Sequence, residues 1–202
     1  MSDRMRAALC LLGIVLLTAA WVVAGLVTAG FDPVQQSISQ LQRDGTATAV
    51  VMSAALAVFA GGAVAFAPVL PRLPRTALLV SGIATLGAAL APLGEVRGGR
   101  QDAVHLGFGA TGYVALSVLP LLAAVHLPGA RRWLAVAAGA VASACLLGTV
   151  PADSVSGALQ RAGFLSAHLW LASLAVQVLR QDQEASSPAA RGRTEGRGTR
   201  PA

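Results

Sequence analysis

Residues 7–45, AALCLLGIVLLTAAWVVAGLVTAGFDPVQQSISQLQRDG, determine the fold class of this 202-residue chain. The first part, residues 7–29, contains no charged side chain, and an α-helix of that length measures about 35 Å. Such a helix crosses a bilayer with some tilt. Because the run is too long for the apolar core of a signal peptide and more runs like it follow, we expect an uncleaved first transmembrane span.

The polar second part, residues 31–45, predicts a short amphipathic helix at the outer membrane surface. Asp32-Pro33 is typical of a helix start, because Asp caps helices well and Pro is favoured at the first helical position. Gln35, three residues after Asp32, completes a capping box. Apolar positions then recur at helical spacing and predict a narrow stripe that covers the outer mouth of a helical bundle: Val34, Ile38 and Leu41.

The composition of the whole chain is that of an integral membrane protein. Hydrophobic residues make up 55% of it and charged residues only 12%, whereas a soluble domain averages about 25% charged residues. Five further apolar runs are bounded by Pro, Gly or Arg clusters: 47–70, 77–93, 103–126, 133–150 and 161–179. We therefore expect residues 1–179 to form an all-α integral membrane bundle of six transmembrane helices. Residues 180–202 are rich in Arg without apolar periodicity and predict a disordered cytoplasmic tail.

The positions of the basic residues predict the orientation in the membrane. The formal net charge is +6, and all fifteen basic residues are Arg. Eleven of the fifteen lie at the N-terminus, in the loops after the second and fourth predicted spans, and in the tail. By the positive-inside rule these segments face the cytoplasm. We expect a multi-pass protein of the cell membrane with both termini cytoplasmic, and no nucleic-acid partner, because the charge follows topology.

Two histidines and three further polar residues are candidates for a functional site. Asp102 and His105 share one face of the fourth span, and His168 lies about 10 Å below the start of the sixth. Ionisable groups within a membrane usually face the bundle interior or a watery cavity. Together with polar residues of the 31–45 segment, they predict a polar pocket in the outer half of the bundle, formed by Asp32, Ser37, Asp102, His105 and His168.

No metal or other cofactor is expected. His126 follows His105 by 21 residues on one predicted helix, so the two lie about 32 Å apart and the three histidines cannot meet. Asp102, His105 and His168 are a possible zinc set by ligand type, but no His or Cys spacing supports one. Ser37 and Ser39 point to different sides of a helix, and neither lies in a nucleophile elbow.

Two short motifs carry a resemblance to a known family. The chain reads GFDPV at residues 30–34 and QSISQL at residues 36–41, which resembles the signature of the bacterial and archaeal membrane proteins of the domain of unknown function 998 (DUF998). Members typically read Tyr-Asp-Pro followed by Ser-x-Ser-x-Leu; here Phe31 replaces the Tyr and Gln40 stands where an acidic residue is common. The resemblance implies a six-helix body and a His near the start of the fourth span, which His105 matches. It implies no activity.

Three functions are compatible with these observations. The first is a membrane protein that holds a small molecule or a lipid in the outer-half polar pocket. The second is a structural or accessory subunit whose polar residues only hold helices together. The third is an intramembrane enzyme that acts on a lipid-linked substrate through the same residues. The lipid bilayer is the partner that all three share.

Overall fold

The computed structural model describes residues 1–150 and 154–185, and within these ranges it is entirely helical apart from turns and loops. Six of the helices described there are long and apolar enough to cross a membrane, which confirms the predicted fold class. They are α1 (Asp3–Val27), α2 (Ala49–Phe66), α3 (Arg72–Leu90), α4 (Arg100–Ala124), α5 (Gly129–Gly148) and α6 (Ser156–Ala185). Two short 3-10 helices are η1 (Ile38–Gln42), between α1 and α2, and η2 (Ala67–Val69), directly after α2.

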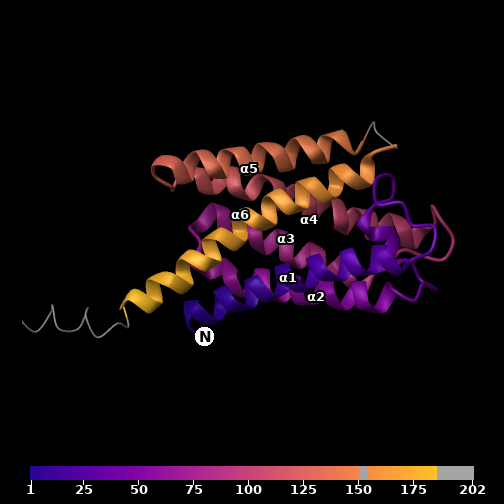
Figure 1. The fold of residues 1–202 in the computed structure, drawn as a ribbon, viewed down its shortest axis with the longest axis horizontal. Coiled ribbons are helices and arrows are strands. Elements are labelled where there is room, and N and C mark those ends of the chain that lie inside the picture. The colour runs from indigo at the N-terminus through magenta and orange to yellow at the C-terminus, as the bar shows by residue number, and fades with distance from the viewer. Residues whose placement is uncertain (151–153, 186–202) are drawn as a thin grey trace, which may run out of the picture.

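The six long helices form one bundle in which consecutive helices are neighbours. α6 closes the bundle, because it contacts α1 and α4 as well as α5, and it crosses the bundle obliquely (Figure 1). The N-terminus and the C-terminal end of α6 lie at one end of the bundle. The 31–45 segment, the α3–α4 loop (residues 91–99) and the start of α6 lie at the opposite end, called the distal end below (Figure 1).

Glycines allow α1 and α2 to approach each other closely. A Cβ atom on Gly62 of α2 would lie only 2.5 Å from the carbonyl oxygen of Leu9, and one on Gly13 of α1 would lie 2.8 Å from Cα of Phe59. Lipid gives no hydrophobic drive for helix association, so close backbone packing must hold these helices together. By contrast, a Cβ on Gly61 would meet nothing within 4 Å.

The apolar side chains divide between a buried core and an exposed outer surface. Large side chains such as Phe59, Phe66 and Leu171 are fully buried between the helices. Others, such as Leu26 and Val50, are about four-fifths exposed. In a bilayer these exposed side chains contact lipid acyl chains, which are equally apolar.

The 31–45 segment is not the single amphipathic helix that its sequence pattern predicts. Only Ile38–Gln42 is helical, and a turn precedes it. The cause is that α6 takes the backbone groups that would bond to each other in an α-helix. The carbonyl of Val34 accepts a hydrogen bond from the backbone N–H of Ala158 at 2.9 Å, and the N–H of Ile38 donates to Oε1 of Gln160 at 2.7 Å.

The predicted apolar stripe of the segment is therefore divided. Ile38 and Leu41 are 6% and 1% exposed and point into the bundle, whereas Val34 is 47% exposed. The segment covers the distal end of the bundle through η1 alone, and its first turn rests on α6.

The helix boundaries differ from the predicted spans by two to six residues, and two of the larger differences have a local cause. α3 begins at Arg72 rather than at residue 77, because Pro71 caps it and Pro74 falls in its first turn, where Pro is tolerated. α6 continues to Ala185, beyond the predicted start of the tail at residue 180. No Gly or Pro interrupts that stretch. The rest of the predicted tail, residues 186–202, lies outside the described residues.

Candidate functional site

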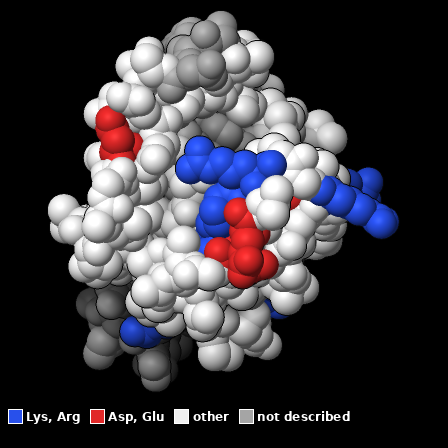
Figure 2. Space-filling model, turned by 90° about the vertical axis from the view of Figure 1, so that its right-hand side faces the viewer, with Lys and Arg blue, Asp and Glu red and all other residues white. Residues whose placement is uncertain are grey.

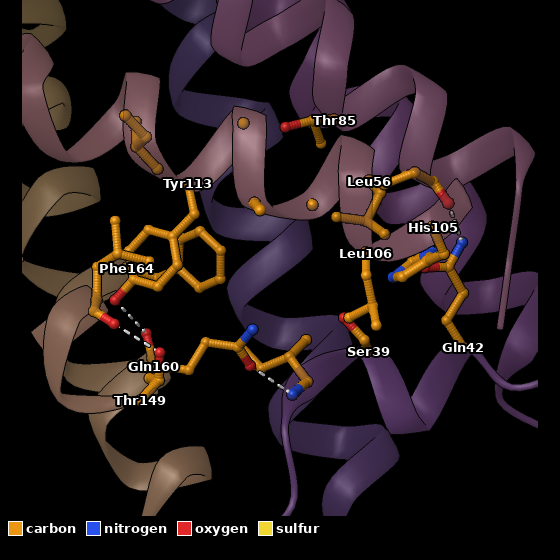
Figure 3. A pocket seen from close by; sticks show the side chains of 17 residues that line it. Ser39, Gln42, Leu56, Thr85, His105, Leu106, Tyr113, Thr149, Gln160 and Phe164 are labelled. Carbon is orange, nitrogen blue, oxygen red and sulfur yellow. Dashed lines mark hydrogen bonds between the residues drawn. The ribbon is translucent and has the colours of Figure 1, made fainter. Parts of the chain in front are cut away.

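A cavity of about 270 Å³ lies between η1, α4 and α6 near the distal end. Its wall is mostly apolar, and none of the described residues that line it is charged. Figure 3 shows His105 and Gln42 at one end of the cavity and Tyr113, Phe164 and Gln160 at the other. The polar lining side chains are Ser39, Gln42, Thr85, His105, Tyr113, Thr149 and Gln160.

His105 is held in one orientation by the end of α3. Its Nδ1 lies 2.8 Å from the carbonyl oxygen of Ala91, the residue that follows α3. Because a carbonyl only accepts, Nδ1 is the donor of this contact, and in a neutral imidazole that tautomer leaves Nε2 as an acceptor. The residue is 2% exposed, and one ring nitrogen points toward the middle of the cavity (Figure 3). His105 thus offers the cavity an oriented hydrogen-bond acceptor.

Gln42, which the sequence pattern did not single out, is fully buried beside the same helix end. Its Nε2 donates to the carbonyls of Ala88 and Ala89 at 3.0 and 3.3 Å and contacts Oγ of Ser53 at 2.8 Å. These carbonyls have no partner within α3, because the last turn of a helix leaves its acceptors free. The two carbonyls fix which way the amide faces, and Oε1 has no partner within the described ranges.

Asp102 holds the α3–α4 loop and does not line the cavity. Its Oδ1 and Oδ2 each accept a backbone N–H at 2.9 Å, from Gly94 and Gly98 respectively. Arg43 of the 31–45 segment lies 3.5 Å from Oδ2 and also donates to the carbonyl of Gly94. Asp102 therefore fastens the loop to the segment, and so positions the Ala91 carbonyl that orients His105.

Further charged residues lie around the Asp102–Arg43 contact at the distal surface. Figure 2 shows basic and acidic side chains beside one another near the middle of the distal end, on a surface that is otherwise mostly uncharged. Asp44, Glu95 and Arg100 line a shallow hollow there. Asp44 accepts a hydrogen bond from the amide of Gln101 at 2.7 Å. These contacts join the 31–45 segment to the first turn of α4.

His168 lines a second, smaller cavity of about 40 Å³. Its ring lies 4.7 Å from the ring of Phe59 and 5.8 Å from that of Phe164, and neither ring nitrogen has a hydrogen-bond partner in the part of the chain that is described. The two cavities share four wall residues: Ile38, Leu56, Thr85 and Phe164. The two histidines thus line adjoining cavities rather than one.

Asp32 and Ser37 line neither of these two cavities. Asp32 Oδ1 accepts from the N–H groups of Val34 and Gln35 at 2.8 and 3.4 Å. It therefore closes a turn with the bonds of a helix cap, whereas Ser37 precedes the only helix of the segment. The return bond of the capping box comes from Oε1 of Gln36, 3.1 Å from the N–H of Asp32, and not from Gln35. Ser37 precedes η1 and its side chain makes no capping hydrogen bond.

Arg161 is a second residue that the sequence pattern did not single out as a site residue. It is 8% exposed, and its Nη1 donates to the carbonyls of Pro33 and Gln36 at 2.6 and 2.8 Å. Arg161 is the first residue of the predicted sixth span, and only the earlier start of α6 at Ser156 places it one turn inside a helix. The positive-inside count assigns this residue to the outer side of the membrane and gives no information on its burial.

The comparison with protein families agrees with this structure. The model of the family described as "Protein of unknown function (DUF998)" matches residues 11–177, which include the 31–45 segment and the residues that line both cavities. Neither a curated protein nor a solved structure matches the chain. The match covers most of the chain and all of α2 to α5. The chain is therefore a multi-pass membrane protein that belongs to the DUF998 family.

Proposed function

We propose that this protein holds a small molecule or a lipid in the 270 Å³ cavity, with His105 as its polar anchor. The observation that carries the proposal is the buried, oriented imidazole of His105, whose free acceptor faces a mostly apolar chamber. Ligand sites combine an apolar wall with a few placed polar groups in this way. His168 belongs to the adjoining chamber, and Asp102 is a positioning residue. Asp32 and Ser37 act only through the 31–45 segment.

The chemistry of the wall favours a neutral amphiphile. An ionised group would lose its hydration without gaining a charged partner among the lining residues, which is costly. At roughly 30 Å³ for the volume of one water molecule, the cavity has the volume of about nine waters, enough for a polar group with a short piece of chain. Leu106 and Ala110 line the cavity and are also exposed on α4. A ligand therefore has access from the surrounding bilayer.

The proposed topology places this cavity in the outer half of the cell membrane. Both described ends of the chain lie opposite the distal end, and most arginines lie on the termini and on the loops of that side. The positive-inside rule then turns the distal end outward.

An accessory role without a ligand is the second candidate. It is favoured by the contacts of Asp102 and Gln42, which are directed at backbone groups of the α3–α4 loop and of α3. In that case the cavity would contain only water or disordered lipid.

Filling the cavity tests the proposal. Gly109 lines it and a Cβ there meets nothing within 4 Å, whereas Gly107, also in open space, lies outside the cavity. Both variants, Gly109→Leu and Gly107→Leu, gain similar helix propensity, so they differ in the cavity alone. We expect mass spectrometry of the purified protein to find a co-purifying compound with the wild type and with Gly107→Leu, and to find it lost with Gly109→Leu. Equal recovery from all three would refute the proposal.

A further inference from the structure

The guanidinium of Arg161 is buried at the junction of α1, α6 and the 31–45 segment. Nη1 donates to three carbonyls, those of Pro33, Gln36 and Gly157, at 2.6, 2.8 and 2.9 Å. The group also lies 5.6 Å from the ring of Trp21 and 5.3 Å from that of Phe31, as in cation–π contacts. One nitrogen and the flat faces are thus fully engaged.

The other edge of the guanidinium has no hydrogen-bond partner among the described residues, and its two nitrogens are buried. Neither Nε nor Nη2 makes a hydrogen bond to any described residue, and the ion pairs found in the described ranges are Arg6–Asp3 and Arg43–Asp102. The Nε–H and Nη2–H bonds run parallel and match two oxygens of a carboxylate or a phosphate. The carboxylate of Asp32 acts on Arg161 from a distance but forms no ion pair with it. A buried charge without a direct partner is costly, so this edge favours an anion.

Arg161 lines an open hollow of about 540 Å³ and is its only charged lining residue among those described. The remaining wall comes from the end of α1 and the residues after it, including Val22, Leu26 and Phe31. Leu26 is 81% exposed, so the hollow faces the bilayer. Arg161 lies about 8 Å from the start of α6, and Trp21 is of the residue type that is enriched at membrane–water interfaces.

We propose that this hollow binds a phospholipid, with the phosphate accepting hydrogen bonds from Nε and Nη2 of Arg161. The phosphate supplies a directly bonded counter-charge at headgroup depth, and the acyl chains cover the apolar wall formed by Val22 and Leu26. Inorganic phosphate fits the same edge but leaves that wall uncovered. The site is separate from the 270 Å³ cavity, with which it shares no lining residue. A negative result for one proposal therefore leaves the other unaffected.

The experiment compares three probes on delipidated protein in a neutral detergent. They are phosphatidylglycerol, diacylglycerol with the same chains but no phosphate, and inorganic phosphate. Thermal unfolding and native mass spectrometry report binding. We expect phosphatidylglycerol to raise the Tm and to remain bound in the mass spectrum, and the other two to do neither. Equal effects of diacylglycerol would overturn phosphate recognition, and equal effects of inorganic phosphate would overturn the lipid as its source.

One conservative variant of Arg161 and one matched pair of Trp variants locate the site. Arg161→Lys keeps the charge and can still donate to the carbonyls of Pro33 and Gln36, but it lacks the two-pronged edge. We expect it to bind phosphatidylglycerol about tenfold more weakly. Leu26→Trp fills the hollow and should abolish binding, whereas Val27→Trp, on an exposed neighbour that does not line it, should not. If Arg161→Lys does not fold, the comparison of Leu26→Trp with Val27→Trp still tests the site. Unchanged phosphatidylglycerol binding by Leu26→Trp overturns the proposal.

Discussion

Single polar side chains at the distal end act mainly on backbone groups that helix ends and loops leave free. Gln42 binds the last carbonyls of α3, His105 binds the carbonyl of Ala91, and Asp102 binds two loop N–H groups. A membrane provides no water for such groups, so a side chain must satisfy them. Polar residues near the ends of spans therefore have a structural function first, and only an atom left over is available to a ligand.

At this scale, Gln42→Leu is predicted to lower the free energy of unfolding by about 1–3 kcal/mol, because it leaves buried carbonyls without a donor. Gln35→Leu is the matched control, since Gln35 is exposed, and its effect should stay within about 0.5 kcal/mol. Denaturation in mixed micelles measures both. A loss no larger than that of Gln35→Leu would show that the buried amide contributes no net stability.

Among the elements, α1 and α2 depend on the shape of one interface more than on any single side chain. A methyl group on Gly62 would lie 2.5 Å from a backbone oxygen of α1 that cannot move without the helix. We predict that Gly62→Ala destabilises the protein by about 1–3 kcal/mol through overpacking. Gly61→Ala, in open space, should be neutral or stabilise it by up to about 1 kcal/mol. Thermal unfolding in detergent distinguishes the two, and equal Tm values would contradict this account.

The 31–45 segment illustrates what the sequence leaves undetermined at the scale of elements. Its cap at Asp32 and the burial of Ile38 and Leu41 follow from local pattern. Its backbone path does not, because the bonds that replace an α-helix come from Ala158 and Gln160, more than 100 residues away. The sequence also does not distinguish the buried Gln42 from the exposed Gln35. The amide of Gln42 has hydrogen-bond partners only because the end of α3 lies beside it.

For the whole molecule, the six-helix fold followed from length and composition, because a chain in lipid must satisfy its backbone within each span. The placement of Asp102 and His105 on one helix face also followed from their spacing. The separation of His105 and His168 into two chambers did not, because Phe164 and Leu56 of two different helices stand between those chambers. Sequence spacing along one helix predicts which side of that helix a residue occupies. The walls of a cavity depend instead on how several helices pack together.

Orientation in the membrane is the remaining property of the whole molecule, and it decides from which side each site is reached. Among the described residues the distal end carries four arginines, whereas the opposite end carries seven, and four of those follow α2 and α4: Arg72, Arg75, Arg131 and Arg132. Basic loops resist translocation, and anionic lipids of the cytoplasmic leaflet attract them further. We therefore predict that the α3–α4 loop faces outward and the α4–α5 loop faces the cytoplasm.

Single cysteines in these two loops test the orientation. Val96 in the first loop and Ala130 beside the second are both exposed, so each accepts a cysteine after the two native ones, Cys10 and Cys145, are replaced by Ala. A membrane-impermeant maleimide added to spheroplasts should label Val96→Cys directly, and Ala130→Cys only after permeabilisation. The reverse pattern would place the distal end in the cytoplasm. Both the His105 cavity and the Arg161 hollow would then draw their lipids from the inner leaflet, because both lie near that end of the bundle.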